Sequence, residues 1–217
     1  MSENQIKSKK RVSEHGEVFT ATREVKAMLD MVKSETERIE SRFLEPACGE
    51  GAFLMEVLRR KLSIVKKRYK GHELEKYSIL ALSSLYGIDI LEDNAIICRE
   101  NLYNIWNSFY AQNCGSECFD ECRKAALYIL KHNILYGNAL TMLRNDGHPI
   151  VFAQWDLILG DQLKRADYSL DALMEAENVQ ISFTMTGWEY DDELKSFIPS
   201  PIKEYPPCEY WKVQNDE

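Results

Sequence analysis

Apolar residues recur along this chain with two different spacings, and the change of spacing marks the expected elements. In one stretch Val25, Met28, Leu29 and Val32 follow one another at helical spacing. Shorter apolar runs that end at a glycine or a carboxylate indicate strands. Strands that alternate with helices predict a parallel sheet with a ligand site beyond its carboxyl ends. Helices are expected over residues 22–38 (with Thr22 as N-cap), 52–65, 73–85, 92–110 and just before 133, and strands over 41–44, 86–90, 133–140 and 155–160.

The same pattern divides the 217 residues into three regions. Residues 1–16 are polar and basic, so we expect a flexible arm with little structure. Residues 17–160 carry the alternating elements and form the expected core. Residues 161–217 contain one candidate strand at 179–185 and a group of aromatic residues. These aromatics are expected to anchor a C-terminal extension to the sheet, with a stacking surface as the alternative: Trp188, Tyr190, Tyr205, Tyr210 and Trp211.

The charge of the chain narrows the function classes. A net charge of −8 argues against a general, charge-driven grip on nucleic acid, which needs a basic face that releases counterions. Any contact with DNA would be local or shared with a partner. The chain shows six cysteines, no apolar run of transmembrane length and no signal-peptide pattern. These features predict a cytoplasmic protein with reduced thiols and no membrane contact.

Three cysteines spaced by four residues, Cys114, Cys118 and Cys122, would share one face of a helix. No histidine lies at ligand spacing from them, so the pattern favours packing over a zinc site, and no metal is expected.

The segment from Phe43 to Leu54 has the order of a strand end, a glycine turn and a helix start. Gly49 and Gly51 allow backbone angles closed to other residues, and the following helix offers free N–H groups to a ligand. Both common phosphate-binding glycine patterns are absent, and the carboxylate of Glu45 precedes the turn. A ligand with a positive centre and hydroxyl groups fits these features best, and S-adenosylmethionine is such a ligand.

A second carboxylate, Asp89, ends the next predicted strand. A carboxylate there can accept two hydrogen bonds from the ribose hydroxyls of a nucleotide. The alternative is a strand-end acid that caps a helix or faces water. The offset from Glu45 to Asp89 is about twice the usual offset of about 20 residues, which predicts an extra helix between the two strands.

Four segments resemble, in order, motifs of the adenine-N6 DNA methyltransferases of restriction-modification systems. Residues 45–51 (EPACGEG) resemble the cofactor loop, motif I, and residues 15–21 (HGEVFTA) resemble motif X, with Ala21 where the family usually has proline. Residues 87–90 (GIDI) and 137–140 (GNAL) resemble motifs II and III. The resemblance covers about residues 12–160. It implies the Rossmann-like fold of class I S-adenosylmethionine-dependent methyltransferases, with a mostly parallel sheet and helices on both faces.

The resemblance also assigns roles to the residues of these motifs. Phe19 and Thr20 would close over the methionine end of S-adenosylmethionine, and Glu45 with the following loop would hold the methionine moiety. Asp89 would bind the ribose and Asn138 the adenine edge, although a turn residue after a glycine is the alternative for Asn138. The cofactor-binding residues implied in this way are Phe19, Thr20, Glu45, Pro46, Ala47, Cys48, Gly49, Gly51, Asp89, Ile90, Asn138 and Ala139.

The chain departs from the family at the catalytic loop, which has the form Asn/Asp-Pro-Pro-Tyr/Phe and follows the fourth strand. Residues 161–164 are Asp-Gln-Leu-Lys here, so only Asp161 keeps the hydrogen-bond acceptor of the first position. The aromatic ring that stacks on a flipped base, and the carbonyl that proline fixes, are both missing.

Two functions therefore remain open. One is a small adenine-N6 DNA methyltransferase with Asp161 as its catalytic residue. The other is a non-catalytic relative that acts as a binding or assembly subunit for a nuclease, a specificity subunit or an intact methyltransferase. The part after residue 160 is short for a target-recognition domain, so we expect DNA binding to need a partner subunit.

Overall fold

Three short parallel strands form the sheet at the centre of the fold. The computed structural model describes residues 8–15, 17–18, 20–115, 119–175, 188–191 and 196–215. In it β1 (Phe43–Glu45), β2 (Leu85–Asp89) and β3 (Ile134–Asn138) pair in parallel, and β4 (Leu143–Arg144) adds antiparallel to the end of β3. The strands predicted over 41–44, 86–90 and 133–140 are thus confirmed, and the fold is mixed α/β with a mostly parallel sheet.

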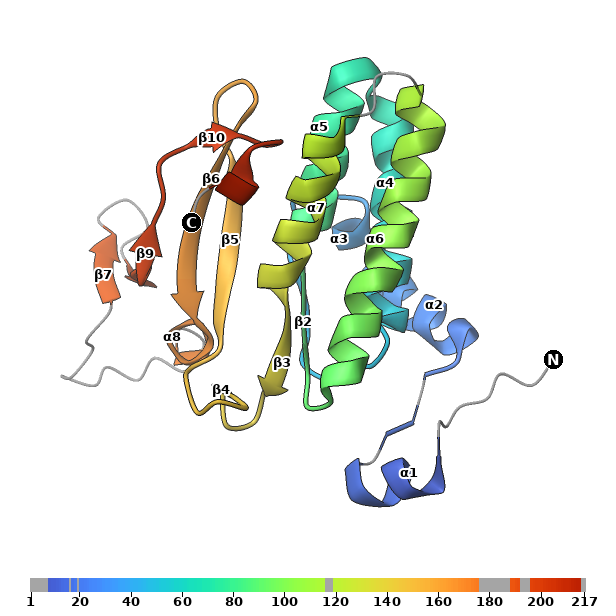
Figure 1. Ribbon diagram of the computed structural model, residues 1–217, viewed down its shortest axis with the longest axis vertical. Coiled ribbons are helices and arrows are strands. Elements are labelled where there is room, and N and C mark those ends of the chain that lie inside the picture. The colour runs from blue at the N-terminus through green and yellow to red at the C-terminus, as the bar shows by residue number, and fades with distance from the viewer. Residues whose placement is uncertain are drawn as a thin grey trace.

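Each connection between parallel strands contains two helices, which confirms the expected extra helix. α4 (Ala52–Arg68) and α5 (Gly71–Ser83) join β1 to β2, and α6 (Glu92–Cys114) and α7 (Asp120–Asn133) join β2 to β3. Figure 1 shows α7 running directly into β3, so that helix and strand follow one line. Buried Asn133 holds this junction, because its Nδ2 donates to the carbonyl oxygens of Ser83 and Leu85, where α5 passes into β2.

The four long helices pack on one another beyond the amino ends of the strands. α6 has 23 residues and spans about 35 Å, whereas a five-residue strand spans about 17 Å. The overhang of α4 and α6 is therefore covered by α5 and α7 rather than by the sheet (Figure 1). The largest side chains of this helical layer are fully buried, including stacked Trp106 and Tyr110.

The two faces of the parallel sheet are covered by different kinds of element. Leu85 belongs to the same core as the helices, and Gly87 faces Leu54 of α4. Tyr86 and Ile88 point the other way, as the two-residue period of a strand requires. They pack with Ile150 and Phe152, just before and at the start of a later strand, and with Leu170 of a short helix. The expectation of helices on both faces is thus wrong for the described residues: a β-hairpin with one short helix covers the second face.

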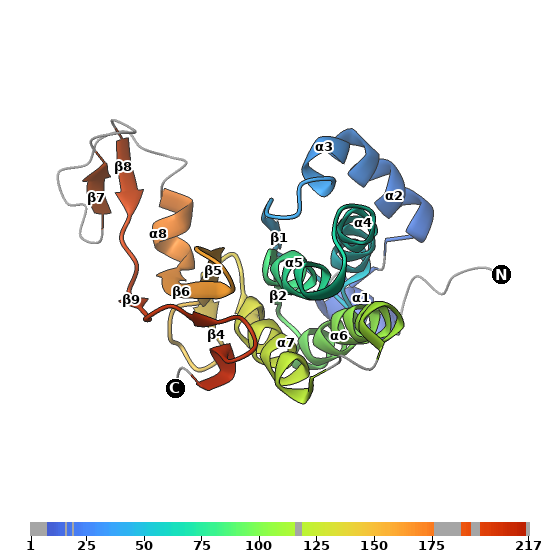
Figure 2. The same cartoon turned by 90° about the horizontal axis from the view of Figure 1, so that it is seen from above.

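This hairpin consists of β5 (Val151–Leu157) and β6 (Gln162–Ser169), which pair antiparallel. β9 (Lys203–Glu204) and β10 (Cys208–Glu209) extend it along β6, and α8 (Leu170–Glu175) follows it. Seen from above, this antiparallel sheet lies beside the parallel sheet and its helices (Figure 2). The strand predicted over 155–160 therefore exists in part, but its assignment as the fourth strand of the parallel sheet is wrong. Pairing with β6 places it in another sheet.

The N-terminal elements differ from the prediction in two details. α1 (Lys9–His15) is a helix within the segment that was expected to have little structure. The helix predicted over 22–38 is divided into α2 (Thr22–Met31) and α3 (Lys33–Thr36), and the N-cap is Ala21 instead of Thr22. Thr22 is the first helical residue, one position after the N-cap.

The C-terminal region adds a second hairpin, β7 (Trp188–Asp191) with β8 (Ser196–Pro199), and a final 3-10 turn, η3 (Val213–Asn215). The strand predicted over 179–185 lies outside the described residues. None of the helices in the described part of the chain combines the length and apolar character needed to cross a membrane.

Candidate functional site at the carboxyl ends of the parallel strands

The glycine turn after β1 is locked to β2 by backbone contacts. Cys48 N–H donates to the carbonyl oxygen of Ile88 (2.9 Å), and Gly51 N–H donates to that of Cys48 (2.8 Å). Gly51 has a φ of 89°, and a Cβ there would lie 2.6 Å from the Cys98 sulfur. Position 51 thus requires glycine for both conformation and space. Helix α4 begins directly afterwards, and its N-cap is Gly51, a residue without a side chain to cap it.

Asp89 joins the turn to the next strand end. Its Oδ2 accepts the Gly49 N–H (2.8 Å), and its Oδ1 accepts the Leu91 N–H (2.9 Å) and the Asn94 Nδ2 (3.2 Å). The side chain is 7% exposed. The structure therefore brings two separately predicted features, the glycine loop and Asp89, into direct contact. Since a carboxylate offers about four acceptor positions, Oδ2 keeps capacity for one further donor.

Glu45 lies at the end of β1 with its carboxylate half-buried. Its carboxylate accepts a long hydrogen bond from the Ala47 N–H at 3.4 Å, and no cation among the described residues lies within 4 Å of it. Burial raises the pKa of Glu45, because the carboxylate loses water without gaining a positive partner. Pro46 and Ala47 are exposed beside it. A half-buried carboxylate of this kind favours a cationic ligand.

Cys48 behaves as a buried thiol. Its contact with the Cys98 thiol, together with burial, raises the pKa of Cys48 above the usual range. At neutral pH the side chain is therefore protonated, which fits a packing role beneath the loop.

The residues after β2 and β3 lie on the same edge of the sheet. Ile90 is 50% exposed, and Ala139 is half-buried. The Asn138 Oδ1 accepts the N–H groups of Leu140 (2.9 Å) and Thr141 (3.4 Å). Asn138 thus forms the side-chain turn that was the alternative for this residue, and this turn uses the amide oxygen but not the amide nitrogen. An apolar side chain and an amide flank the end of the sheet.

The segment that resembles motif X reaches the same end of the molecule. Phe19 lies outside the described residues, and Thr20 is exposed. Glu17, three residues before Thr20, accepts a hydrogen bond from Asn94 Nδ2 at 2.7 Å. Since Asn94 also contacts Asp89, the start of this segment lies next to the glycine loop.

Asp161 lies at the opposite end of the molecule. It follows β5, which runs away from the carboxyl ends of β1 to β3, and the β5–β6 turn lies at the far end in Figure 1. Its carboxylate contacts His72 Nε2 (3.0 Å) and Lys76 Nζ (3.5 Å) near the start of α5. The 13 residues of α5 alone span about 20 Å, and β2 follows before Asp89 is reached. The structure does not bring the candidate catalytic residue to the candidate cofactor site.

The surroundings of Asp161 form a second polar network, which sequence reasoning missed. Buried Glu75 accepts hydrogen bonds from the hydroxyls of Tyr110 and Tyr210, both at 2.6 Å. Tyr210 also contacts His72 Nδ1 at 3.3 Å. We call His72, Glu75, Tyr110, Asp161 and Tyr210 the far-end network. Tyr210 acts as the expected anchor of the C-terminal extension: its hydroxyl contacts helix α5, while β9 and β10 attach the extension to β6 of the antiparallel sheet.

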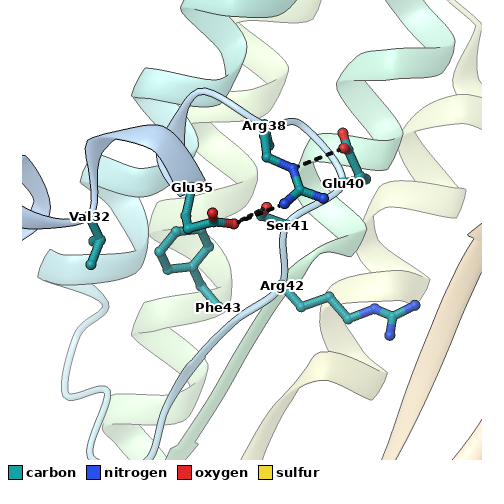
Figure 3. A pocket seen from close by; sticks show the side chains of 7 residues that line it. All are labelled: Val32, Glu35, Arg38, Glu40, Ser41, Arg42 and Phe43. Atoms are coloured by element: carbon teal, nitrogen blue, oxygen red, sulfur yellow. Dashed lines mark hydrogen bonds and ion pairs between the residues drawn. The ribbon is translucent and has the colours of Figure 1, made fainter. Parts of the chain in front are cut away.

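A hollow of about 450 Å³ lies beside the amino end of β1 (Figure 3). Its charges neutralise one another, because Arg38 pairs with Glu35 (3.5 Å) and Glu40 (3.3 Å). Arg42 points away from this group and pairs with Asp156 of β5. The hollow therefore offers no uncompensated charge to a ligand. Within the described ranges there is also no group of His, Cys, Asp and Glu that could hold a metal ion.

Comparisons with protein-family models, with curated proteins and with solved structures found no match for this chain. We therefore base the proposed function on the sequence motifs and on the geometry at the carboxyl ends of β1 to β3, which we call the loop end.

Proposed function

We propose that the chain binds S-adenosylmethionine at the carboxyl ends of β1, β2 and β3, in a fold related to the class I methyltransferases. The observation that carries the proposal is Glu45, a half-buried carboxylate without a cationic partner among the described residues. Burial of such a charge is costly unless a partner compensates it. The ammonium group of S-adenosylmethionine is a partner of the required sign.

The neighbouring groups suit the other parts of this ligand. The start of α4, with Gly51 at its N-cap, offers N–H groups to the carboxylate of the methionine moiety. Asp89 Oδ2 can accept a ribose hydroxyl, and exposed Ile90 offers an apolar face to the adenine ring. The motif X segment at Glu17 lies beside them.

For the activity, the position of Asp161 favours the second of the two candidates. In the family that the motifs resemble, the catalytic loop follows a strand of the parallel sheet and faces the cofactor. Here the corresponding strand belongs to an antiparallel hairpin, and Asp161 takes part in the far-end network. We therefore propose a cytoplasmic, non-catalytic relative of adenine-N6 DNA methyltransferases. It would use its cofactor site within an assembly with a nuclease, a specificity subunit or an active methyltransferase of a restriction-modification system, and would contact DNA through that partner.

Titration calorimetry with S-adenosylmethionine tests the binding proposal. We expect saturable binding to the wild-type chain and clearly weaker binding to Glu45→Gln, which keeps the shape of the side chain but removes its charge. Glu40→Gln, an exposed acid before β1 that pairs with Arg38, is the matched control and should bind as wild type. Absence of binding at millimolar ligand would overturn the proposal.

A methyl-transfer assay on DNA tests the proposal that the chain is non-catalytic. The chain alone should transfer no labelled methyl group, whereas full activity of the isolated chain would show that it is an adenine-N6 DNA methyltransferase. Transfer that depends on Asp161 would place this residue in an active site despite its position in the far-end network.

A further inference from the structure

A chain of hydrogen bonds connects Asp89 to the N-terminal helix α1. Four side chains form it, and we call them the N-terminal clasp: Arg11 of α1, Glu17 of the following segment, and Asp93 and Asn94 of the first turn of α6. The clasp adjoins the proposed ribose-binding carboxylate. Its members come from segments about 80 residues apart in the sequence.

Asn94 is the member in contact with Asp89, and its orientation is fixed. Its side chain is 1% exposed. Nδ2 donates to Glu17 Oε1 (2.7 Å) and to Asp89 Oδ1 (3.2 Å), and Oδ1 accepts from Arg11 Nη2 (3.1 Å). A carboxylate only accepts and a guanidinium only donates. A flipped amide would therefore face each neighbour with the wrong group, so the N–H must point at Asp89.

Arg11 holds the other side of the clasp. Its guanidinium makes paired contacts with Glu17 (2.6 and 2.8 Å) and with Asp93 (2.7 and 3.2 Å). The hydrogen bonds to Asp93 and then to Glu17 raise the pKa of Arg11 above its usual range. The cation thus neutralises two acids that would otherwise repel Asp89 and each other. A fork-shaped guanidinium suits this arrangement better than a lysine would.

We propose that Asn94 is a positioning residue that holds the Asp89 carboxylate in one orientation. Arg11 and Glu17 couple this orientation to the docking of α1 against the start of α6. This inference rests on the proposed binding of S-adenosylmethionine. With Oδ1 of Asp89 occupied by Leu91 N–H and Asn94, Oδ2 is the oxygen left to the ribose. Recognition of the ribose hydroxyls is therefore regulated by whether the N-terminal helix is in place.

The test compares two ligands, S-adenosylmethionine and its 2′,3′-dideoxy analogue, by calorimetry on the full chain. The wild type should prefer the ligand with hydroxyls. Asn94→Ala should weaken S-adenosylmethionine about three- to tenfold, the value of one hydrogen bond, and leave the analogue nearly unchanged. If Asn94 had a purely structural role, Asn94→Ala would weaken the binding of both ligands equally. A change in the ratio of the two affinities therefore identifies a positioning role.

Arg11→Gln should lower the same ratio, and the matched control Arg38→Gln should not. Arg38 also pairs with two acids, but it lies beside the amino end of β1 and is 59% exposed. Thermal unfolding checks that each variant is folded. If the wild type binds neither ligand, the proposed function itself fails. If it binds and discriminates, and both Asn94→Ala and Arg11→Gln keep the wild-type ratio, the positioning role is overturned while the binding proposal stands.

Discussion

The carboxylates at the two ends of the molecule differ in how fully they are hydrogen-bonded. At the far end, Glu75 is 3% exposed, and each of its oxygens accepts a tyrosine hydroxyl at 2.6 Å. At the loop end, Glu45 is half-buried with one long contact to a backbone N–H. Burial alone would suggest that Glu75 is the functional acid. The completeness of its hydrogen bonds argues instead for a structural role, since a satisfied buried network rigidifies the fold.

The same contrast separates Asp89 from Asp161. Asp89 is held by backbone N–H groups and Asn94 at the edge where three parallel strands end. Asp161 is held by the side chains of His72 and Lys76, on the surface between α5 and the hairpin. Asp89 thus keeps an acceptor position on Oδ2. The carboxylate of Asp161 instead joins α5 to the turn between β5 and β6.

Among these predictions, we expect the largest change in free energy for a substitution of Glu75. Glu75→Ala leaves the hydroxyls of Tyr110 and Tyr210 without their acceptor and should lower the free energy of unfolding by about 3 kcal/mol. Chemical denaturation measures this. Glu73→Ala, two residues earlier on α5 and exposed, is the matched control and should cost less than about 1 kcal/mol. The affinity of the folded Glu75 variant for S-adenosylmethionine should stay unchanged, and a loss of affinity would break the separation of the two ends.

In contrast to Glu75→Ala, Asp89→Ala should show its main effect on ligand binding. Loss of a charged acceptor at the ribose should weaken binding of S-adenosylmethionine by about 1.5 to 3 kcal/mol. Calorimetry on the folded variant measures this, with Asp93→Ala, on the outer side of the clasp, as a milder comparison. An unchanged affinity would show that Asp89 only holds the loop to β2 and that the ribose lies elsewhere.

Local pattern was sufficient to predict the loop end. The strand, the glycine turn and the helix start are each encoded within a few residues, and parallel strands end at one edge of a sheet. That is why Glu45, Asp89 and Asn138, each at the end of its strand, lie at the same edge of the sheet. The pairing of Asn138 within its own turn was also foreseen as an alternative.

The far end could not be predicted in the same way. An apolar run such as that of β5 identifies a strand but not its direction or its partner, which depend on pairing with β6 and on the turn at Gly160, where φ is 69°. The far-end network joins α5, α6 and the C-terminal extension, and the clasp joins α1 to α6. Such contacts between distant segments leave no periodic signal in a single sequence.

The titration of Glu45 should change stability and ligand affinity by less than the substitutions of Glu75 and Asp89 do. Its raised pKa means that the folded chain holds the proton to higher pH than the unfolded chain does, so stability without ligand should fall as the pH rises through that window. A cationic ligand reverses the preference, because it favours the ionised carboxylate. Affinity for S-adenosylmethionine should thus decline as the pH is lowered through the Glu45 titration, and Glu45→Gln should remove this decline. Equal pH dependence in both proteins would mean that another group titrates.

The smallest effect is expected at Asp161. Partial burial acts to raise its pKa, but the hydrogen bond to His72 and the charge of Lys76 outweigh it and lower the pKa. The stabilisation is therefore present above the pKa of an unfolded aspartate and is lost as the pH falls through the lowered value. An ion pair this exposed is worth less than about 1 kcal/mol, so Asp161→Ala should match the surface control Asp146→Ala in denaturation. It should also leave the binding of S-adenosylmethionine unchanged. If Asp161→Ala instead weakens the ligand while Asp146→Ala does not, the two ends communicate, and the assignment of Asp161 to a purely structural network must be given up.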